Sequence, residues 1–269
     1  MPELPEVETI KNELAPCITG RRIIAVELPD TWIVKEPIPD AFIKSLTGST
    51  IKEIERRGKY LIVHLSNRKY LIIHLRMTGA LLFNCPDDRY VRAIFRFDGG
   101  DRLAFSDRRR LGVLRLVCSI RDLKNKLGPE PLDKGFTSKK LAEKFKGRNA
   151  PIKAVLLDQH VVAGVGNMYA DELLFMAKIH PLRRTDSLTE KEIKTIHTSM
   201  LRVLKSAIAG KGASVDTYKR PDGNEGTAHT EFAVAHQLGK PCPRCSTPIQ
   251  RLMIRNRGSY YCPSCQRQS

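Results

Sequence analysis

The sequence is poor in acidic residues, in aromatic residues and in long hydrophobic runs. Its 269 residues include 29 Asp and Glu against 46 Lys and Arg, which leaves a formal charge of +17. Aromatic residues make up 6% of the chain, and no run approaches the roughly 18 apolar residues of a membrane-spanning helix. The hydrophobic share of 41% is near the globular average, which excludes wholesale disorder. The charge favours a polyanionic partner, which could be DNA, RNA, a ribosome or an anionic membrane surface.

The chain also lacks the marks of export. Its first ten residues, MPELPEVETI, are acidic and contain no apolar segment of the kind that a signal peptide needs. Seven cysteines, an odd number, argue against a disulfide framework. Cys17, Cys85 and Cys118 are scattered and are interpreted as small hydrophobic packing residues. We therefore expect a cytoplasmic protein with no membrane segment.

Hydrophobic periodicity divides the chain into a strand-rich part and a helical part. Residues 2–14 read as a helix, and from about 21 to 118 apolar residues alternate as in short antiparallel strands, which favours a sandwich or a barrel. Residues 119–136 read as a linker, and helical patterns follow up to about residue 209. Ser187 and Glu190 have the spacing of a capping box for the last helix, and residues 213–229 read as a mobile loop.

Four cysteines near the end form the strongest single motif. Cys242 and Cys245 make one Cys-x-x-Cys pair, Cys262 and Cys265 make another, and the spacer can form a hairpin. Four thiolates complete a tetrahedral Zn²⁺ site and leave no position for water, so we expect one structural zinc ion. The basic and aromatic residues of the spacer could bind phosphate, or they could be a solvated surface.

Two more motifs point to phosphate and to nucleophilic chemistry. Gly164-Val165-Gly166-Asn167 precedes a helix and could bind a phosphate at the helix N-terminus, although a plain corner between helices has the same pattern. Removal of Met1 would leave Pro2 with a free secondary amine, which is partly neutral at cellular pH and can attack a sugar C1′ atom. Glu3 beside it could transfer protons.

Three basic segments stand at expected strand ends. They are Arg56-Arg57-Gly58-Lys59-Tyr60, His74-Leu75-Arg76-Met77 and Arg108-Arg109-Arg110-Leu111. Their cations could contact DNA, and Met77 and Leu111 could wedge into a duplex step. Ordinary core residues and solvated charges explain the same pattern equally well.

Taken together, these motifs resemble the formamidopyrimidine-DNA glycosylases of bacterial base-excision repair. The resemblance runs from end to end of the chain. It rests on MPELPEVET, Gly58-Lys59-Tyr60-Leu61, His74-Leu75-Arg76-Met77-Thr78-Gly79, Asp107-x-Arg109-Arg110, Leu157-Asp158-Gln159, the segment from Gly164 to Glu172, and the cysteine hairpin, all in the family's order.

The resemblance implies an α+β fold, in which an N-terminal helix and an antiparallel β-sandwich precede a helix–two-turn–helix domain and a C-terminal zinc finger. We expect the domains at residues 1–130, 131–230 and 231–269. The implied activity is that of a bifunctional glycosylase and AP lyase, which excises oxidised purines through a Schiff base and then cleaves the strand by β- and δ-elimination. The implied partner is double-stranded DNA with oxidised bases or abasic sites, bound by a monomer in the bacterial nucleoid.

The resemblance also assigns roles to residues. Pro2 displaces the base, Glu3 transfers protons, Lys59 assists at the phosphate or in elimination, and Arg257 of the zinc finger grips phosphates. Tyr218 lies in the loop that closes over the extruded base. The remaining implied DNA contacts are His74, Met77, Tyr90, Arg109, Leu111, Lys153 and Asn167.

The sequence departs from the family pattern at three single positions and in the loop of residues 216–224, which keeps Tyr218 but little else of the usual pattern. Leu111 stands where a Phe is usual, Arg108 where many members have Pro, and Tyr90 about where a His is frequent. An endonuclease VIII-like enzyme for oxidised pyrimidines is the alternative within the superfamily, and Leu4 in place of Gly favours the purine branch. A catalytically inactive zinc-finger DNA-binding protein is the other alternative, against which the intact Pro2 speaks.

Overall fold

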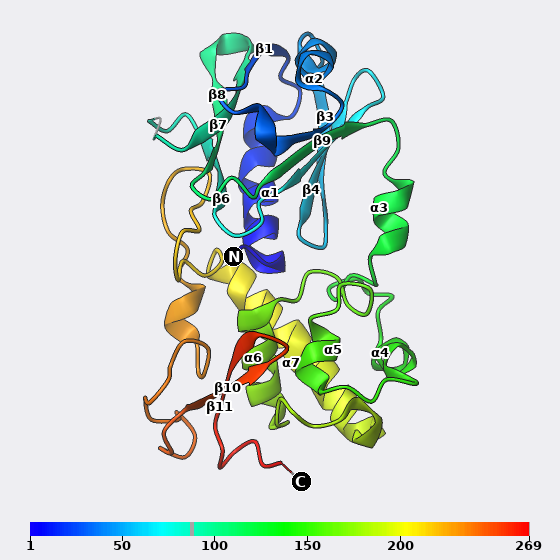
Figure 1. Cartoon of the computed structure of the whole chain (residues 1–269), viewed down its shortest axis with the longest axis vertical. Coiled ribbons are helices and arrows are strands. Elements are labelled where there is room, and N and C mark those ends of the chain that lie inside the picture. The colour runs from blue at the N-terminus through cyan, green and yellow to red at the C-terminus, as the bar shows by residue number, and fades with distance from the viewer. Residues whose placement is uncertain (87–88, 269) are drawn as a thin grey trace. The chain divides into compact units, whose positions relative to one another are not determined.

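The computed structural model describes residues 1–86 and 89–268, and the chain forms two compact units (Figure 1). The N-terminal unit comprises Met1–Asn125 and Ile208–His229, and the C-terminal unit comprises Lys126–Ala207 and Thr230–Ser269. The predicted α+β class is confirmed, because the first unit contains antiparallel sheets and the second contains helices and a short hairpin.

Two sheets build the N-terminal unit. The four-stranded sheet has the order β1 (Ile23–Glu27), β7 (Val91–Phe97), β8 (Arg102–Asp107), β6 (Gly79–Phe83). The five-stranded sheet has the order β2 (Val34–Glu36), β9 (Val113–Val117), β5 (Tyr70–His74), β4 (Tyr60–Leu65), β3 (Ile51–Arg57). Every pairing is antiparallel except that of β2 with β9.

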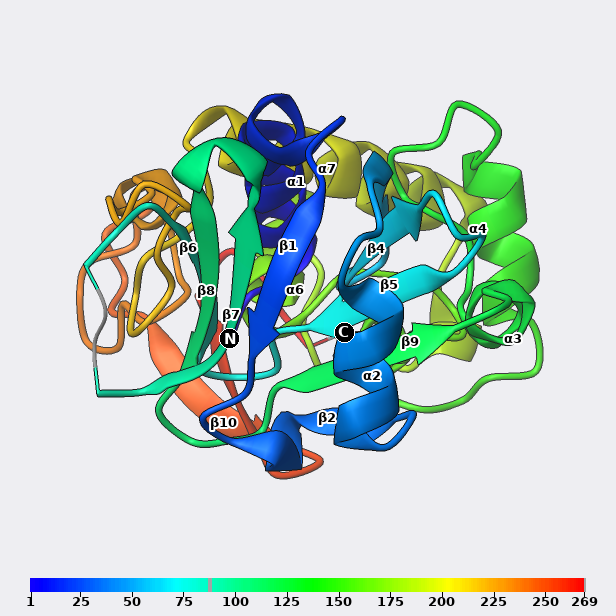
Figure 2. The same cartoon turned by 90° about the horizontal axis from the view of Figure 1, so that it is seen from above.

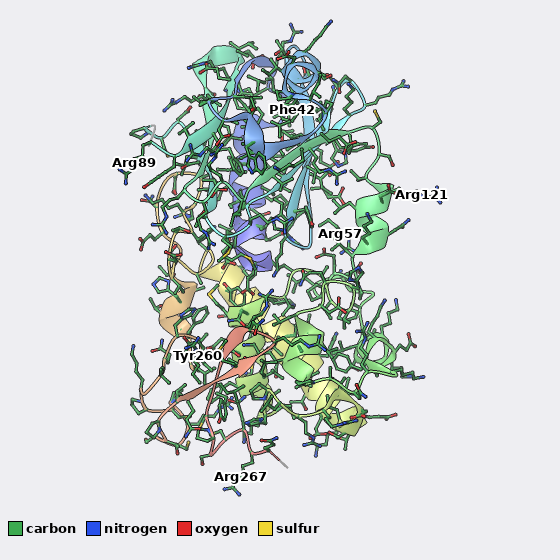
Figure 3. All side chains as sticks on the ribbon, viewed as in Figure 1. Phe42, Arg57, Arg89, Arg121, Tyr260 and Arg267 are labelled. Carbon is green, nitrogen blue, oxygen red and sulfur yellow. The ribbon has the colours of Figure 1, made fainter. Side chains whose placement is uncertain are left out.

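The sheets form two layers with the hydrophobic core of the unit between them, as Figure 2 shows. Phe95 and Phe105 from one sheet and Leu61 and Ile73 from the other belong to one buried cluster. Helix α2 (Pro39–Leu46) adds Phe42, which is fully buried and is labelled in Figure 3. The predicted β-sandwich is therefore confirmed.

Helix α1 (Leu4–Ile18) contributes an apolar face to the same core. Pro5 stands in its first turn, where a missing backbone N–H costs nothing. The helix is longer than the predicted span 2–14, because its buried face continues from Leu14 to Ile18 and Pro16 lies near the C-terminal end. The short helix α3 (Arg121–Lys126) has no buried residue and lies in the segment interpreted as a linker.

Residues 208–229 pack with the N-terminal unit, although the sequence-based division placed them with the helical domain. The Ala213 N–H donates to Glu6 Oε1 at 2.8 Å, and the Phe83 N–H donates to the Pro221 carbonyl at 2.7 Å. Tyr218 is buried in the sandwich core. The polar segment 213–229, which the sequence suggested to be a mobile loop, is thus attached to the N-terminal unit at three points.

The C-terminal unit consists of helices around a buried core, followed by a β-hairpin. Its helices are α4 (Ser138–Phe145), α5 (Ile152–Leu156), α6 (Asn167–Ala177) and α7 (Glu190–Ala209), and its hairpin is β10 (Gln250–Ile254) with β11 (Arg257–Tyr261). The capping box of α7 is formed by Thr189 and Glu192, whose side chains and N–H groups bond reciprocally at 2.7 and 3.3 Å, and not by the predicted pair two residues earlier. Among the described residues, no helix is both long and apolar enough to cross a membrane.

Candidate active site and DNA-contact residues

The residues at the start of α1 are fixed by a buried carboxylate. Pro2 is buried, and Glu3, the N-cap residue, is only 1% exposed. Glu6 Oε2 accepts the Glu3 N–H at 2.7 Å, and its other oxygen accepts the Ala213 N–H. Glu6 therefore joins the predicted nucleophile segment to the segment that contains Tyr218, a link that local sequence spacing could not reveal.

Lys59 lies in the two-residue turn between β3 and β4. Arg57 and Tyr60 face each other as the last pair of the hairpin, so Gly58 and Lys59 form the turn. Gly58 has φ +56°, the left-handed backbone that a glycine adopts readily at the first position of such turns. Lys59 is buried, with 8% of its surface exposed.

Arg56 ties this turn to α1. Its Nε lies 2.5 Å from Glu8 Oε2, and its Nη1 donates to the Gly58 carbonyl at 3.0 Å. Burial would raise the pKa of Glu8, but hydrogen bonds from Lys11 and Arg56 outweigh it, and the pKa is lowered. One guanidinium thus links α1, which Pro2 and Glu3 directly precede, to the turn that carries Lys59.

His74 ends β5 and is held as a neutral imidazole. Burial, together with the charges of Arg76 and Lys59, lowers its pKa from 6.5 to about 3. Its Nδ1 accepts the Arg76 N–H at 3.0 Å, so the ring proton resides on Nε2. The ring also packs edge-on against Tyr60 at 4.4 Å between centroids. His74 can therefore offer one N–H donor to a phosphate without carrying charge.

Asp107 organises the loop after β8. This fully buried carboxylate accepts the Thr78 hydroxyl and the Arg109 N–H with one oxygen, and the Gly112 N–H with the other. A Cβ at Gly112 would collide with the Phe105 ring, which explains the glycine there. The loop that carries two predicted DNA contacts is thus preformed by hydrogen bonds.

Two apolar side chains of this region are exposed to an unusual degree. Met77 is 42% exposed and Leu111 is 40% exposed. Arg109 Nη1 lies 3.1 Å from Met77 Sδ, so the structure brings these two predicted residues together, and Leu111 follows in the same loop. Exposed apolar tips beside a guanidinium suit insertion between base pairs. Tyr90 is half-buried, and its carbonyl accepts the Asp107 N–H at 2.9 Å.

Tyr218 points into the protein and not toward solvent. It is 5% exposed, and its hydroxyl donates to the Lys211 carbonyl at 3.1 Å. Burial, with the charges of Glu6 and Glu13, raises its pKa. The neighbouring Thr217 hydroxyl lies 3.5 Å from the Met77 carbonyl. Within the N-terminal unit, the segment predicted to cover an extruded base therefore reaches the predicted wedge residue.

The four predicted zinc ligands come together in the C-terminal unit. The sulfur atoms of Cys242, Cys245, Cys262 and Cys265 all lie within 4.8 Å of one another. Three of the distances are 3.9, 3.4 and 3.5 Å, close to the roughly 3.8 Å edge of a tetrahedron with Zn–S bonds of about 2.3 Å. Geometry and donor type therefore fit one structural Zn²⁺.

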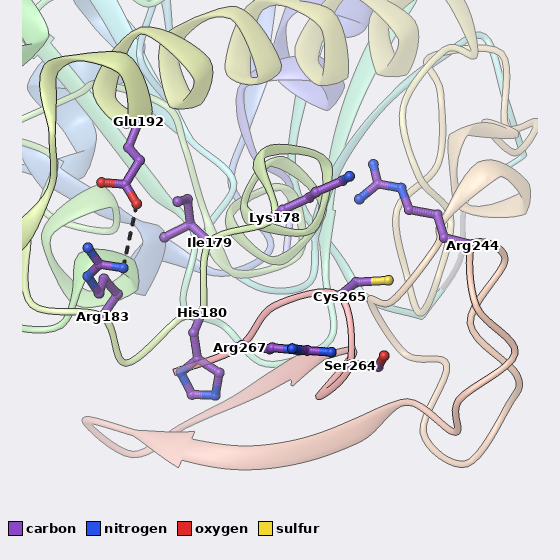
Figure 4. Close-up of a pocket in the computed structure, with 9 residues that line it drawn as sticks. All are labelled: Lys178, Ile179, His180, Arg183, Glu192, Arg244, Ser264, Cys265 and Arg267. Atoms are coloured by element: carbon purple, nitrogen blue, oxygen red, sulfur yellow. Dashed lines mark ion pairs between the residues drawn. The ribbon is translucent and has the colours of Figure 1, made fainter. Parts of the chain in front are cut away.

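Cationic side chains gather beside this zinc site. A pocket of about 480 Å³ next to Cys265 is lined by Lys178, Arg183, Arg244 and Arg267, as Figure 4 shows. Four thiolates around one Zn²⁺ would leave two net negative charges, which suits a basic surrounding. Of these cations, Arg183 is paired with Glu192 of the same pocket at 3.5 Å. Arg244 also donates to the Phe175 carbonyl at 2.6 Å, where a cation complements the C-terminal end of α6.

Arg257 begins β11 after a tight turn. Arg255 and Asn256 both have positive φ, at 43° and 61°, as expected in a two-residue turn that matches the twist of a hairpin. Arg257 is exposed, so the hairpin presents its guanidinium to solvent. This geometry suits a phosphate contact.

Lys153 and Asn167 both bind the hairpin. Lys153 is fully buried, and its Nζ lies 2.7 Å from Asp171 Oδ1 and 3.1 Å from the Gly258 carbonyl. Asn167 Nδ2 donates to the same carbonyl at 3.0 Å. Burial raises the pKa of Asp171, and the Lys153 ammonium opposes that rise. Asp171 was not singled out from the sequence, because no spacing rule marks the carboxylate that will meet a buried lysine.

Three family models match successive parts of the chain. Residues 1–114 match the formamidopyrimidine-DNA glycosylase N-terminal domain, residues 127–219 match the H2TH domain of the same family, and residues 239–268 match a zinc finger found in FPG and IleRS. Together these models define a DNA glycosylase with a zinc finger.

Named relatives are similar in sequence to this chain over nearly its whole length. Proteins called formamidopyrimidine-DNA glycosylase from Symbiobacterium thermophilum and Chloroflexus aurantiacus are 43% and 42% identical, over 99% of this chain and 89% and 98% of theirs. Structures of the Lactococcus lactis Fpg with abasic-site DNA and with Fapy-dG DNA are 37% identical, with TM-scores of 0.92 and 0.91 over 99% of this chain and 100% of theirs. The chain belongs to the formamidopyrimidine-DNA glycosylase family.

Proposed function

We propose that this protein excises oxidised purines, formamidopyrimidine and 8-oxoguanine, from duplex DNA and then cleaves the strand at the abasic site. One arrangement supports this function above all. Arg56 contacts both Glu8 of α1, the helix that Pro2 and Glu3 precede, and the Gly58 carbonyl in the turn of Lys59. The proposed nucleophile segment and the proposed lysine are thus linked through one side chain. The relatives' names and their Fapy-dG and abasic-site complexes support the same substrate class.

In this mechanism Met1 is removed, and the Pro2 nitrogen attacks C1′ of a nucleotide turned out of the stack. A C1′–N bond forms, the glycosidic bond breaks, and the base leaves with a proton. Glu3 moves protons at the opening deoxyribose, and the resulting iminium withdraws electrons from the sugar. Loss of a C2′ proton then expels the 3′ phosphate, and a second elimination expels the 5′ phosphate. Lys59 assists at these phosphates.

The remaining predicted residues hold the duplex. We assign phosphate contacts to His74 and Arg257, and the space left by the flipped nucleotide to Met77, Arg109 and Leu111. The exposure of Met77 and Leu111 supports this assignment. Tyr90, Lys153 and Asn167 lie beside these contacts in their own units, and Tyr218 anchors the segment that would cover the extruded base.

Cys242, Cys245, Cys262 and Cys265 would hold the zinc ion with four thiolates, so the ion would supply structure and no catalytic position. Of the three expected domains, residues 1–130 would supply the chemistry and residues 231–269 the finger. Residues 131–230 would supply the helical DNA contact, together with the segment 208–229 that packs with the N-terminal unit. We place the protein, acting as a monomer, at the bacterial nucleoid in the cytoplasm, where its substrate is found.

Strand cleavage on matched duplexes tests the substrate class. Duplexes that contain 8-oxoguanine opposite C should be cut faster than duplexes with dihydrothymine, and abasic duplexes should be cut as well. Cleavage confined to dihydrothymine would assign the enzyme to oxidised pyrimidines. Binding without cleavage of any duplex would leave only a DNA-binding protein.

A further inference from the structure

A completely buried lysine lies under the zinc-finger hairpin. Lys153 on α5 is 0% exposed. Its ammonium forms an ion pair with Asp171 Oδ1 at 2.7 Å and donates hydrogen bonds to Ser259 Oγ at 2.8 Å and to the Gly258 carbonyl at 3.1 Å. A phosphate could reach this ammonium only by displacing partners that already compensate its burial.

Asp171 on α6 completes the arrangement. It is 1% exposed, and its second oxygen accepts the Tyr260 N–H at 3.2 Å. A buried charge without a counter-charge is costly, so Lys153 and Asp171 depend on each other. The hairpin groups that these two side chains contact lie in residues 258–260 of β11, the strand in which Tyr260 is labelled in Figure 3.

The held residues follow Arg257 directly. The Gly258 carbonyl receives both Lys153 Nζ and Asn167 Nδ2, and the Ser259 hydroxyl donates to the Arg257 carbonyl at 3.4 Å. The backbone that carries the Arg257 side chain is thus fixed on the side toward the helices. The hairpin is attached to the helical unit here through side chains of α5 and α6, whereas the four cysteines cross-link the finger within itself.

We propose that Lys153 and Asp171 are positioning residues, which anchor β11 to α5 and α6 and so orient Arg257 for phosphate binding. This inference rests on the phosphate-binding role proposed for Arg257. It replaces the direct DNA contact that the family resemblance implies for Lys153 with an indirect one. The two roles differ in how the effects of substitutions combine.

A double-mutant cycle on DNA binding separates them. The probe is a duplex with a tetrahydrofuran abasic analogue, bound by Lys153→Met, Arg257→Ala and the double variant, each with its zinc content measured. We expect each single substitution to weaken binding about tenfold and to flatten the salt slope by about one unit. In the Arg257→Ala background, Lys153→Met should change Kd less than about twofold. A double variant weakened by the product of the two single effects would overturn the proposal, because independent phosphate contacts add.

Two further variants serve as a control and as a fallback. Lys194→Met removes an exposed lysine of α7 and should leave Kd unchanged. If Lys153→Met does not fold, the paired change of Lys153→Met with Asp171→Leu removes both buried charges at similar volume, which proteins often tolerate. The same cycle with Arg257→Ala then applies, with the same expected loss of additivity.

Amide hydrogen exchange without DNA tests the anchor separately from the function. The N–H groups of Gly258, Ser259 and Tyr260 should exchange at least about tenfold faster in zinc-loaded Lys153→Met, and at the wild-type rate in Arg257→Ala. Unchanged exchange in Lys153→Met would overturn the anchor whatever the DNA result. Faster exchange, combined with full DNA affinity of Arg257→Ala, would support the anchor and overturn the phosphate role of Arg257.

Discussion

His74 shows how burial sets the state of a single side chain. Its ring lies beside Tyr60, and the charges of Lys59 and Arg76 add to burial in opposing a proton. A pKa of about 3 keeps the ring neutral at every pH at which DNA repair operates. The proposed phosphate contact of His74 is therefore a neutral hydrogen bond, and its strength should not vary with pH between about 6 and 8.

The same shift predicts how stability depends on pH. The unfolded chain protonates His74 below about pH 6.5, whereas the folded protein does so only near pH 3, so stability is lost as the pH falls through this range. Between pH 7 and pH 5 the wild type should lose about 2 kcal/mol more unfolding free energy than His74→Gln. Urea unfolding at both pH values measures the difference. Equal losses in the two proteins would show that His74 titrates normally.

Among the elements, the β3–β4 turn and α1 are held together by side-chain contacts. Arg56 is the connection, since it contacts Glu8 and the Gly58 carbonyl at once. A turn of two residues moves with its strands, so a shift of the strands relative to α1 would also move Lys59 relative to α1. Misplacement of a catalytic group by about 1 Å can cost up to about 100-fold in rate.

Replacement of Arg56 by Gln should therefore lower the rate of strand cleavage about tenfold or more, with little effect on affinity for abasic-analogue DNA. Lys11→Gln is the matched control, because Lys11 Nζ contacts Glu8 at 2.6 Å while no contact joins it to the turn in the part of the chain that the structure describes. Single-turnover cleavage and equilibrium binding measure the two effects. Equal rates for the two variants would refute the positioning role of Arg56.

Elements with a strong local signal were predictable, and those without one were not. The alternation of apolar residues predicted β4. Gly164 and Gly166 predicted a helix start near Asn167, and α6 begins at that residue. Helix α3 escaped prediction because none of its residues is buried, so it has no apolar face to detect. The capping box of α7 lies two residues later than predicted, because several Ser, Thr and Glu residues there share the required spacing.

The candidate site was predictable in its residues but not in their partners. The sequence named Lys59, Asn167 and the four cysteines through motifs, which are local. It could not name Arg56, Asp107 or Asp171 as organisers, since each acts through a contact that only folding creates. The contacts of the segment 213–229 were hidden for the same reason, because Glu6 and Tyr218 join it to the sandwich across a long stretch of sequence.

In the molecule as a whole, the finger packs on its helical unit through two of the predicted zinc ligands. Cys242 and Cys262 belong to a buried cluster with Phe175, Val234 and Ile249, so these two ligands are also core residues. Removal of the metal would leave four cysteine side chains unligated at close range, two of them in that core. The finger should then loosen and release Arg257 from its proposed position.

Elemental analysis should find about one zinc per chain, and chelation should weaken binding to abasic-analogue DNA about tenfold or more. The expected loss has a structural cause, so reconstitution with Zn²⁺ should restore affinity. Protein without zinc that nevertheless binds at full affinity would contradict the structural role of the four cysteines.

Borohydride trapping with mapping of the cross-link tests whether the Pro2 amine does the chemistry. The protein is incubated with a labelled duplex that contains 8-oxoguanine opposite C, reduced with borohydride, digested and analysed by mass spectrometry. We expect one cross-link, on Pro2 of chains that have lost Met1, and its loss when the amine is blocked by a retained Met1. A cross-link on Lys59 or another lysine, or full trapping by protein that retains Met1, would show that Pro2 is not the nucleophile.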